Sequence, residues 1–197
     1  MKSFRISSIL IAALLFTAAS CKKPDNSPAN YFSFKGRNYE ITSAFIDKDA
    51  RDTVLGLHMD LYLLRSITTK DTADLYLGAA DLQAIPITGN FPSLDINSQA
   101  NRQASCLMFL PNKSAYESGP GGSVDIALSG VTYSLHFNSI SAGVYTYGLG
   151  GASQYTEADK IGGRYSGVPV SANIVAYSAR TNSFFQKLVL NRKASHN

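Results

Sequence analysis

The stretch TVLGLHMDLYLL, residues 53–64, decides the fold class. Its leucine and methionine side chains recur at every second position from Leu55 to Leu63, and His58 and Asp60 fall between them. A repeat of two places neighbouring side chains on opposite faces of a β-strand, whereas a helix repeats every 3.6 residues. The spacing therefore predicts a strand whose leucine face lies in the core and whose His58–Asp60 face meets solvent.

The stretch YFSFKGRNYEI, residues 31–41, shows the same alternation on both sides of a glycine. Glycine at the first central position favours a two-residue turn of type II′, so we expect the turn at Gly36-Arg37. That register puts Phe34 opposite Tyr39 and gathers the apolar side chains of both strands on one face. The pattern predicts a hairpin at the start of the domain.

A second hairpin is predicted over residues 123–138, which read SVDIALSGVTYSLHFN. Its turn is expected at Ser129-Gly130, which places Leu128 opposite Val131. The apolar residues before and after the turn again share one face, so this pairing is also self-consistent.

Further segments of the chain have the composition of strands, and turn-rich segments separate them. They are Leu75–Ala80, Ser105–Leu110, Gly143–Tyr147, Gly163–Val170, Ala172–Tyr177 and Phe184–Leu190. No long amphipathic helix follows the N-terminal segment. These features predict an all-β fold, a single antiparallel β-sandwich or barrel of roughly nine or ten strands over residues 31–193, with a tail at residues 194–197.

The first twenty residues are typical of a secretion signal. Lys2 and Arg5 give a positive start, and residues 9–19 form an apolar run of eleven residues. A helix needs roughly 20 apolar residues to span the hydrocarbon core of a membrane, so this run is too short to be a membrane anchor by itself. We expect residues 1–20 to be removed.

The stretch AASC, residues 18–21, resembles the lipobox of bacterial lipoproteins. In that family the cysteine thiol receives a diacylglycerol, the signal is removed, and the new amine is acylated with a fatty acid such as palmitate. The resemblance implies that Cys21 is the lipidation site, that residues 21–30 are a lipidated tether, and that Lys22 directs the protein to the outer membrane. The resemblance leaves undecided whether the protein lies on the periplasmic face or the surface face of the outer membrane. Plain secretion with a leftover cysteine is the alternative.

Two further resemblances point to the same group. The start SCKK, residues 20–23, is similar to lipoproteins of Bacteroidetes-type bacteria. The first hairpin, the second hairpin and the stretch KIGGRYSGVPV, residues 160–170, look like small all-β lipoprotein domains of these bacteria, for which no activity can be carried over.

The charge balance argues against a nucleic-acid partner. The chain has 18 Lys and Arg residues against 14 Asp and Glu residues. Removal of the signal takes Lys2 and Arg5 with it, and the remaining charges are scattered rather than gathered in a stripe. Nucleic-acid-binding proteins usually concentrate basic residues on one face.

Two groups of polar residues could begin a metal site. The side chains of His58 and Asp60 project from the same face of their predicted strand, but no third ligand residue lies at a spacing typical of a metal site. Asp47, Asp49 and Asp52 alternate in IDKDARD, yet basic residues intrude and the glycine and distal glutamate of a calcium loop are missing. We expect a solvent-facing strand in the first case and a self-neutralised exposed turn in the second. No metal or cofactor is predicted.

His136 invites comparison with a catalytic triad. In the predicted hairpin it faces Ser123 and lies diagonally from Asp125, on the polar face of the sheet. The sequence has no G-x-S-x-G nucleophile elbow. A triad is recognised by geometry, so we assign no catalytic residue from the sequence.

The strongest candidates for ligand binding are four tyrosines, Tyr145, Tyr147, Tyr155 and Tyr165, which cluster around a glycine-rich loop. Tyrosine combines a flat apolar face with a hydroxyl, which suits contact with a sugar or a peptide. The alternative is that these side chains cap the edge of the β core. Cys106, in the apolar stretch SCLMFL, is expected to be a small buried thiol.

These observations predict a lipid-anchored envelope lipoprotein whose β-domain is a non-catalytic binding or structural module. Its partners would be the membrane, through the lipid, and a glycan, a peptide or an envelope protein. One alternative is a secreted hydrolase with a spatially assembled site, for which the pairs Asp125 with His136 and His58 with Asp60 are the first suspects. The other is a β-barrel carrier of an apolar ligand, which requires a closed internal cavity.

Overall fold

The computed structural model describes residues 27–52, 57–82, 86–94, 100–147 and 153–172, together with Ile174. Every regular element in this part of the chain is a β-strand. The predicted signal, Cys21 and the predicted tail lie outside the described residues.

The strands are β1 (Tyr31–Phe34), β2 (Arg37–Glu40), β3 (Ser43–Asp52), β4 (Leu57–Ile67), β5 (Thr72–Asp81), β6 (Gly89–Pro92), β7 (Arg102–Phe109), β8 (Ala115–Ser118), β9 (Ser123–Ser129), β10 (Thr132–Tyr147), β11 (Ser153–Gly167) and β12 (Val170–Ser171).

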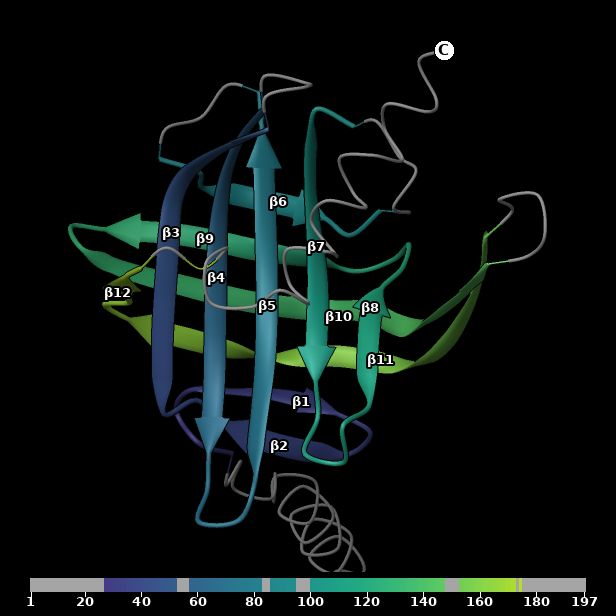
Figure 1. Ribbon diagram of the computed structural model, residues 1–197. Coiled ribbons are helices and arrows are strands. Elements are labelled where there is room, and N and C mark those ends of the chain that lie inside the picture. Colours follow the sequence, from purple (N-terminus) through teal and green to yellow (C-terminus); the bar gives the residue numbers. More distant parts are fainter. Residues whose placement is uncertain are drawn as a thin grey trace, which may run out of the picture.

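All these strands belong to one continuous sheet with the order β12-β3-β4-β5-β7-β8-β10-β11-β1-β2, and β9 and β6 branch from β10. In Figure 1, β3, β4, β5, β7 and β8 form a front wall, and β9, β10, β11, β1 and β2 run crosswise behind it. The walls join where β8 pairs with β10. The pairings are antiparallel except that between β12 and β3.

The prediction of an all-β domain is confirmed, but the predicted closed architecture is wrong. In the described part of the chain, the sheet curls into an open half-barrel and closes into neither a sandwich nor a barrel, because its path ends at β12 and β2 without a pairing between them. Alternation along each strand predicts which face is buried, but closure depends on pairing between distant strands, which alternation does not reveal.

The main core lies between the two walls. The strands of both walls contribute alternate side chains to it, as half-buried strands must. From the rear wall come Phe32, Phe34, Val124, Ile126, Leu135, Phe137 and Ile161, and from the front wall come Tyr62, Leu64, Leu75, Leu77, Cys106 and Met108.

The stretch that predicted the fold class is described from Leu57 onward, and its residues 60–64 are buried on both faces, so the predicted choice of face is wrong. Tyr62 and Leu64 point into the main core, and Asp60 on the same face is also buried. The leucine face is the outer one, where Leu61 belongs to a second apolar cluster that includes Ile174. More than a hundred residues separate Ile174 from β4, so local alternation could not reveal this cover.

The first hairpin turns one residue earlier than predicted. Lys35 and Gly36 have φ values of 50° and 70°, as the two central residues of a type I′ turn require. Phe32 therefore lies opposite Tyr39, and the two rings stack with centroids 5.1 Å apart. The predicted register was wrong by two residues, but a shift of two keeps every side chain on its predicted face.

The second hairpin turns one residue later than predicted, at Gly130-Val131. Tyr133 lies opposite Leu128, and Val131 is exposed in the turn rather than paired in the core. This correction matters for the site, because it moves His136 from a position opposite Ser123 to one opposite Asp125.

Candidate functional site

A row of polar side chains crosses the outer face of the rear wall. Residues directly opposite in neighbouring strands share a face and lie about 5 Å apart. The pairings of β6, β9, β10, β11, β1 and β2 place six such residues in one line. In order they are Asn90, Asp125, His136, Arg164, Tyr31 and Glu40.

A shallow trough runs beside this row. It has a volume of about 540 Å³, and its walls include Asn90, Asp125, His136 and Arg164. Its floor comes from the next row, where Ala127 and Ser134 are short side chains. The trough exists because small residues in one row follow long ones in the next on the same face.

Two amides hold the Asp125 carboxylate in place. Asn90 Nδ2 donates to Asp125 Oδ1 at 2.6 Å, and Asn138 Nδ2 donates to Oδ2 at 2.7 Å. Both amides also donate to the Ser123 hydroxyl, at 2.9 and 3.3 Å respectively. The network joins β6, β9 and β10, and it fixes the direction in which the carboxylate points.

The network also keeps Asp125 ionised. Donation by Asn90, then by Asn138, lowers the pKa of the Asp125 carboxyl below its ordinary value, and the nearby His136 acts in the same direction. A carboxyl with a lowered pKa is a permanent hydrogen-bond acceptor at neutral pH and a poor general acid.

Arg164 anchors the middle of the row. Its Nε donates to the Ala29 carbonyl at 3.2 Å, and its guanidinium lies 5.6 Å from the centre of the Tyr31 ring. Asn30 exchanges two hydrogen bonds with the backbone of Ser166 on β11. The last described residues of the predicted tether are therefore bound to the domain beside the trough.

The structure brings Asp125 and His136 together but does not build a triad with Ser123. The Ser123 hydroxyl accepts from Asn90 and Asn138 instead, and it lies one row away from His136. The proximity of Asp125 and His136 could be predicted from the sequence, because both lie on one hairpin. Asn90 and Arg164 were missed because β6 and β11 reach the hairpin through long-range pairing.

The four predicted tyrosines do not form one exposed group. Tyr165 belongs to the main core. Tyr145 is buried and its ring lies 4.9 Å from that of the half-buried Tyr155. The Tyr155 hydroxyl lies 3.2 Å from the Ser141 hydroxyl. The side chain of Tyr147 and most of the glycine-rich loop lie outside the described residues. The ligand-binding role of these residues stays a prediction.

The structure also places the aspartates that the sequence analysis considered as metal ligands. The predicted solvent-facing position of Asp60 is wrong, since this carboxylate lies between the walls beside Tyr62, whose pKa is raised by burial and then by Asp60. The predicted turn at Asp47 is a bulged part of β3, and Asp47 Oδ2 accepts from the backbone of Ile174. The side chains of Asp49 and Asp52 lie outside the described residues.

Cys106 is buried, as predicted. Burial raises the pKa of its thiol to about 12, so the reactive thiolate is scarce at neutral pH. Within the described residues, His, Cys, Asp and Glu side chains form no group of three or more that could hold a metal ion. Among the same residues, no helix has the length and apolar character needed to cross a membrane.

Comparison of the chain with protein-family models, with curated proteins and with solved structures finds no match.

Proposed function

We propose that this protein is a lipoprotein of the bacterial cell envelope, held at the outer membrane through acylated Cys21. Its β-domain is a non-catalytic module that binds a hydroxyl-rich ligand, such as a glycan, in the trough. The observation that supports this site most directly is the Asp125 carboxylate, held by two amides at the wall of an open trough.

The chemistry of the trough suits a glycan. A carboxylate offers about four lone-pair positions, so two amide donors leave room for hydroxyl donors from a ligand. His136 and Ser134 add polar groups along the same wall and floor. Ala127 supplies an apolar surface on which the C–H groups of a sugar ring can lie.

A secreted hydrolase is the second candidate, and the meeting of Asp125 and His136 in one trough favours it. Two observations support binding instead. Ser123, the hydroxyl that the sequence analysis compared with a triad nucleophile, accepts hydrogen bonds from Asn90 and Asn138. The pKa of Asp125 is lowered, whereas a general acid at neutral pH needs a raised one.

A carrier of an apolar ligand has less support. Aromatic pairs occupy the space between the walls, among them Phe32 with Tyr39 at 5.1 Å and Tyr62 with Tyr133 at 5.8 Å. The trough, in contrast, lies on the outer face. We therefore place the ligand outside the half-barrel.

Asp125→Asn is expected to weaken glycan binding by roughly 10- to 100-fold, because it removes a charged acceptor whose hydrogen bonds are worth about 1.5–3 kcal/mol. The variant keeps the shape of the side chain. Calorimetric titration of the purified protein with neutral and acidic oligosaccharides measures the change.

Asp159→Asn is the matched control, since Asp159 contacts its own neighbour Lys160 and lies outside the trough. Equal affinity of Asp125→Asn and the wild type for a bound oligosaccharide would contradict the trough as the site. A loss of binding in Tyr155→Ala, with Asp125→Asn unaffected, would move the site to the predicted tyrosines. No binding to any oligosaccharide would contradict the ligand class.

Cys21→Ser is expected to move the protein from the detergent phase to the aqueous phase. Each acyl CH₂ buried in a bilayer contributes about 0.8 kcal/mol, and the variant has no thiol to carry the diacylglycerol. Detergent phase partitioning and the intact mass of the purified protein measure the change. A wild-type Cys21 of unmodified mass would contradict the anchor.

A further inference from the structure

We propose that one end of the domain binds the phosphate headgroups of an anionic membrane surface. This inference rests on the proposed lipid anchor, which brings that end to the bilayer. The surface consists of three turns, Lys35–Arg37, Thr68–Asp71 and Pro111–Ser114, which we call the basic pole. They follow β1, β4 and β7, at the lower end of the molecule in Figure 1.

Contacts between the turns fix the basic pole as one surface. Lys35 Nζ donates to the Tyr116 hydroxyl on β8 at 3.0 Å, which holds the first turn beside the third. The Arg37 guanidinium lies 3.5 Å from the Asp71 carboxylate, which joins the first turn to the second. A groove of about 410 Å³ opens among them, and residues from all three turns line it.

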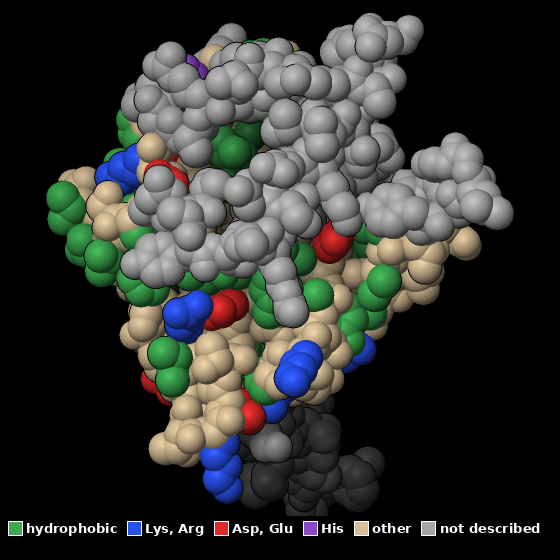
Figure 2. Space-filling model, viewed as in Figure 1, with side chains coloured by type: hydrophobic (Ala, Val, Ile, Leu, Met, Phe, Trp, Pro, Cys, Tyr) green, Lys and Arg blue, Asp and Glu red, His purple; other side chains and the backbone are tan. Residues whose placement is uncertain are grey.

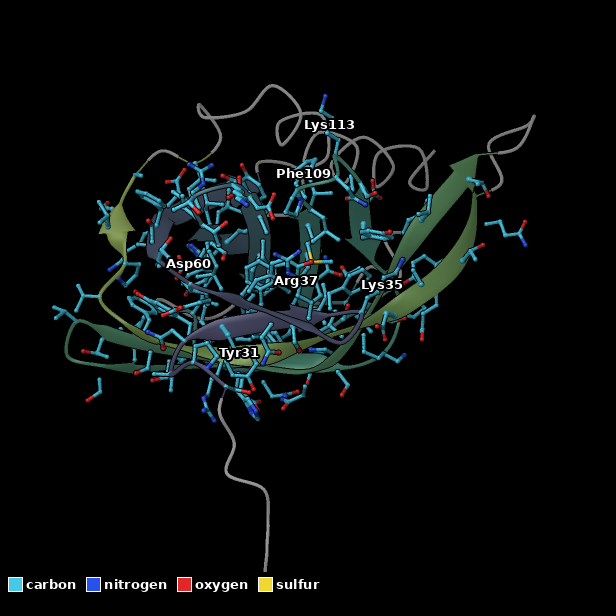
Figure 3. All side chains as sticks on the ribbon, turned by 90° about the horizontal axis from the view of Figure 1, so that it is seen from below. Tyr31, Lys35, Arg37, Asp60, Phe109 and Lys113 are labelled. Carbon is cyan, nitrogen blue, oxygen red and sulfur yellow. The ribbon has the colours of Figure 1, made fainter. Side chains whose placement is uncertain are left out.

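The basic pole is positively charged. Lys35, Arg37, Lys70 and Lys113 are exposed, and Figure 3, which views this end from below, labels three of them. The acidic residues at the groove are Asp71, which contacts Arg37, and Glu40. Four cationic side chains therefore face two carboxylates. Figure 2 shows Lys and Arg side chains at the same lower end of the surface.

Two of these lysines stand in backbone conformations that lysine rarely adopts. Lys35 has a φ of 50° and Lys113 a φ of 65°. Turn positions with positive φ favour glycine or asparagine, because Cβ crowds the backbone there. Ser139 is the third such residue of the described chain that is not glycine. Strained residues of this kind often mark functional positions. Here the strained conformation is accompanied by a positive charge at the tip of each turn.

The predicted tether leaves the domain at the basic pole. Asn38, next to Arg37, donates from its side chain to the Ser27 hydroxyl, and Pro28 lines the groove. Residues 21–26 remain between this point and the lipid, and they span at most about 20 Å. The tether can therefore bring the pole within the Debye length of the headgroups, about 8 Å at physiological salt. Lys22 and Lys23 add two charges along the way.

The test uses the mature chain, residues 21–197, with Cys21→Ser so that no acyl chain masks the contact. Flotation with vesicles of phosphatidylcholine and phosphatidylglycerol should show binding that falls as salt rises, and vesicles of phosphatidylcholine alone should show none. Lys35→Asn with Lys113→Asn should weaken binding at least ~10-fold, since each basic residue near an anionic surface adds to the attraction. Asparagine tolerates positive φ, so the pair keeps the conformation of each turn, although it removes the contact between Lys35 and Tyr116.

Lys48→Gln with Lys160→Gln is the matched control, because it removes the same charge elsewhere on the exposed surface. An equal loss in both pairs would overturn the proposal, since net charge alone would then explain the binding. Absence of binding to anionic vesicles would also overturn it. Saturable binding of inorganic phosphate at Lys35 and Lys113, seen by NMR titration without vesicles, would assign a soluble anion instead. Acylation of the wild type, read from its mass, is unaffected by any of these results.

Discussion

Gly163→Ala is expected to remove a large part of the stability of the protein, at a cost above ~4 kcal/mol. Gly163 lies in β11 with a φ of 125°, a conformation that residues with a side chain rarely adopt. A Cβ at this position would lie 2.3 Å from the Tyr31 carbonyl oxygen and 2.7 Å from the Phe32 Cα. Both are backbone atoms of β1 and cannot rotate away. The loss compares with a total stability of about 5–15 kcal/mol for a typical domain.

Gly36→Ala separates the clash from the backbone conformation. Gly36 also has positive φ, but a Cβ there would meet nothing within 4 Å. We expect Gly36→Ala to cost only about 1–2 kcal/mol, the penalty for an L-residue in the left-handed region. Urea unfolding followed by circular dichroism measures both variants. Similar losses in the two would show that β1 can move away from β11, and would contradict the close approach.

Phe32→Ala is expected to destabilise the domain by about 3–5 kcal/mol, because it removes a ring from a filled core and leaves a cavity. Phe32 is fully buried, stacks on Tyr39, and lies opposite Gly163. The loss should appear as a lower urea midpoint with an unchanged slope.

Val131→Ala is the control for this change. Val131 is 69% exposed in the turn of the second hairpin, and exposed substitutions of this kind usually stay within about 0.5 kcal/mol. A loss at Val131 as large as that at Phe32 would mean that the turn packs against another surface. It would then support the register that the sequence predicted, in which Val131 faces Leu128.

The two hairpins show what the local alternation of side chains could predict and what it could not. Alternation placed Phe32, Phe34 and Tyr39 correctly on one face, and it did the same for the second hairpin. It could not choose between turns that differ by one residue, because each choice keeps the faces unchanged. The first turn also uses Lys35 at positive φ, where the usual preference for glycine points to the next residue.

The site was predictable only where it is local. Asp125 and His136 lie on one hairpin, so the sequence predicts that they are close even in the wrong register. Asn90, which helps to hold the carboxylate, could not be assigned to it, because β6 is short and pairs with β9 across more than thirty residues. Short strands such as β6 and β8 have too few alternating positions to stand out from loops.

The sequence by itself determined the β class and the burial parity of both hairpins, because these follow from side chains that alternate along a strand. Only the tertiary structure decided that the sheet stays open, that β4 is covered on both faces, and that a polar row crosses six strands. Each of these depends on which distant strands pair and in which register. That pairing is formed by backbone hydrogen bonds, which are nearly the same for every residue type. The sequence therefore contains little information about which distant strands pair.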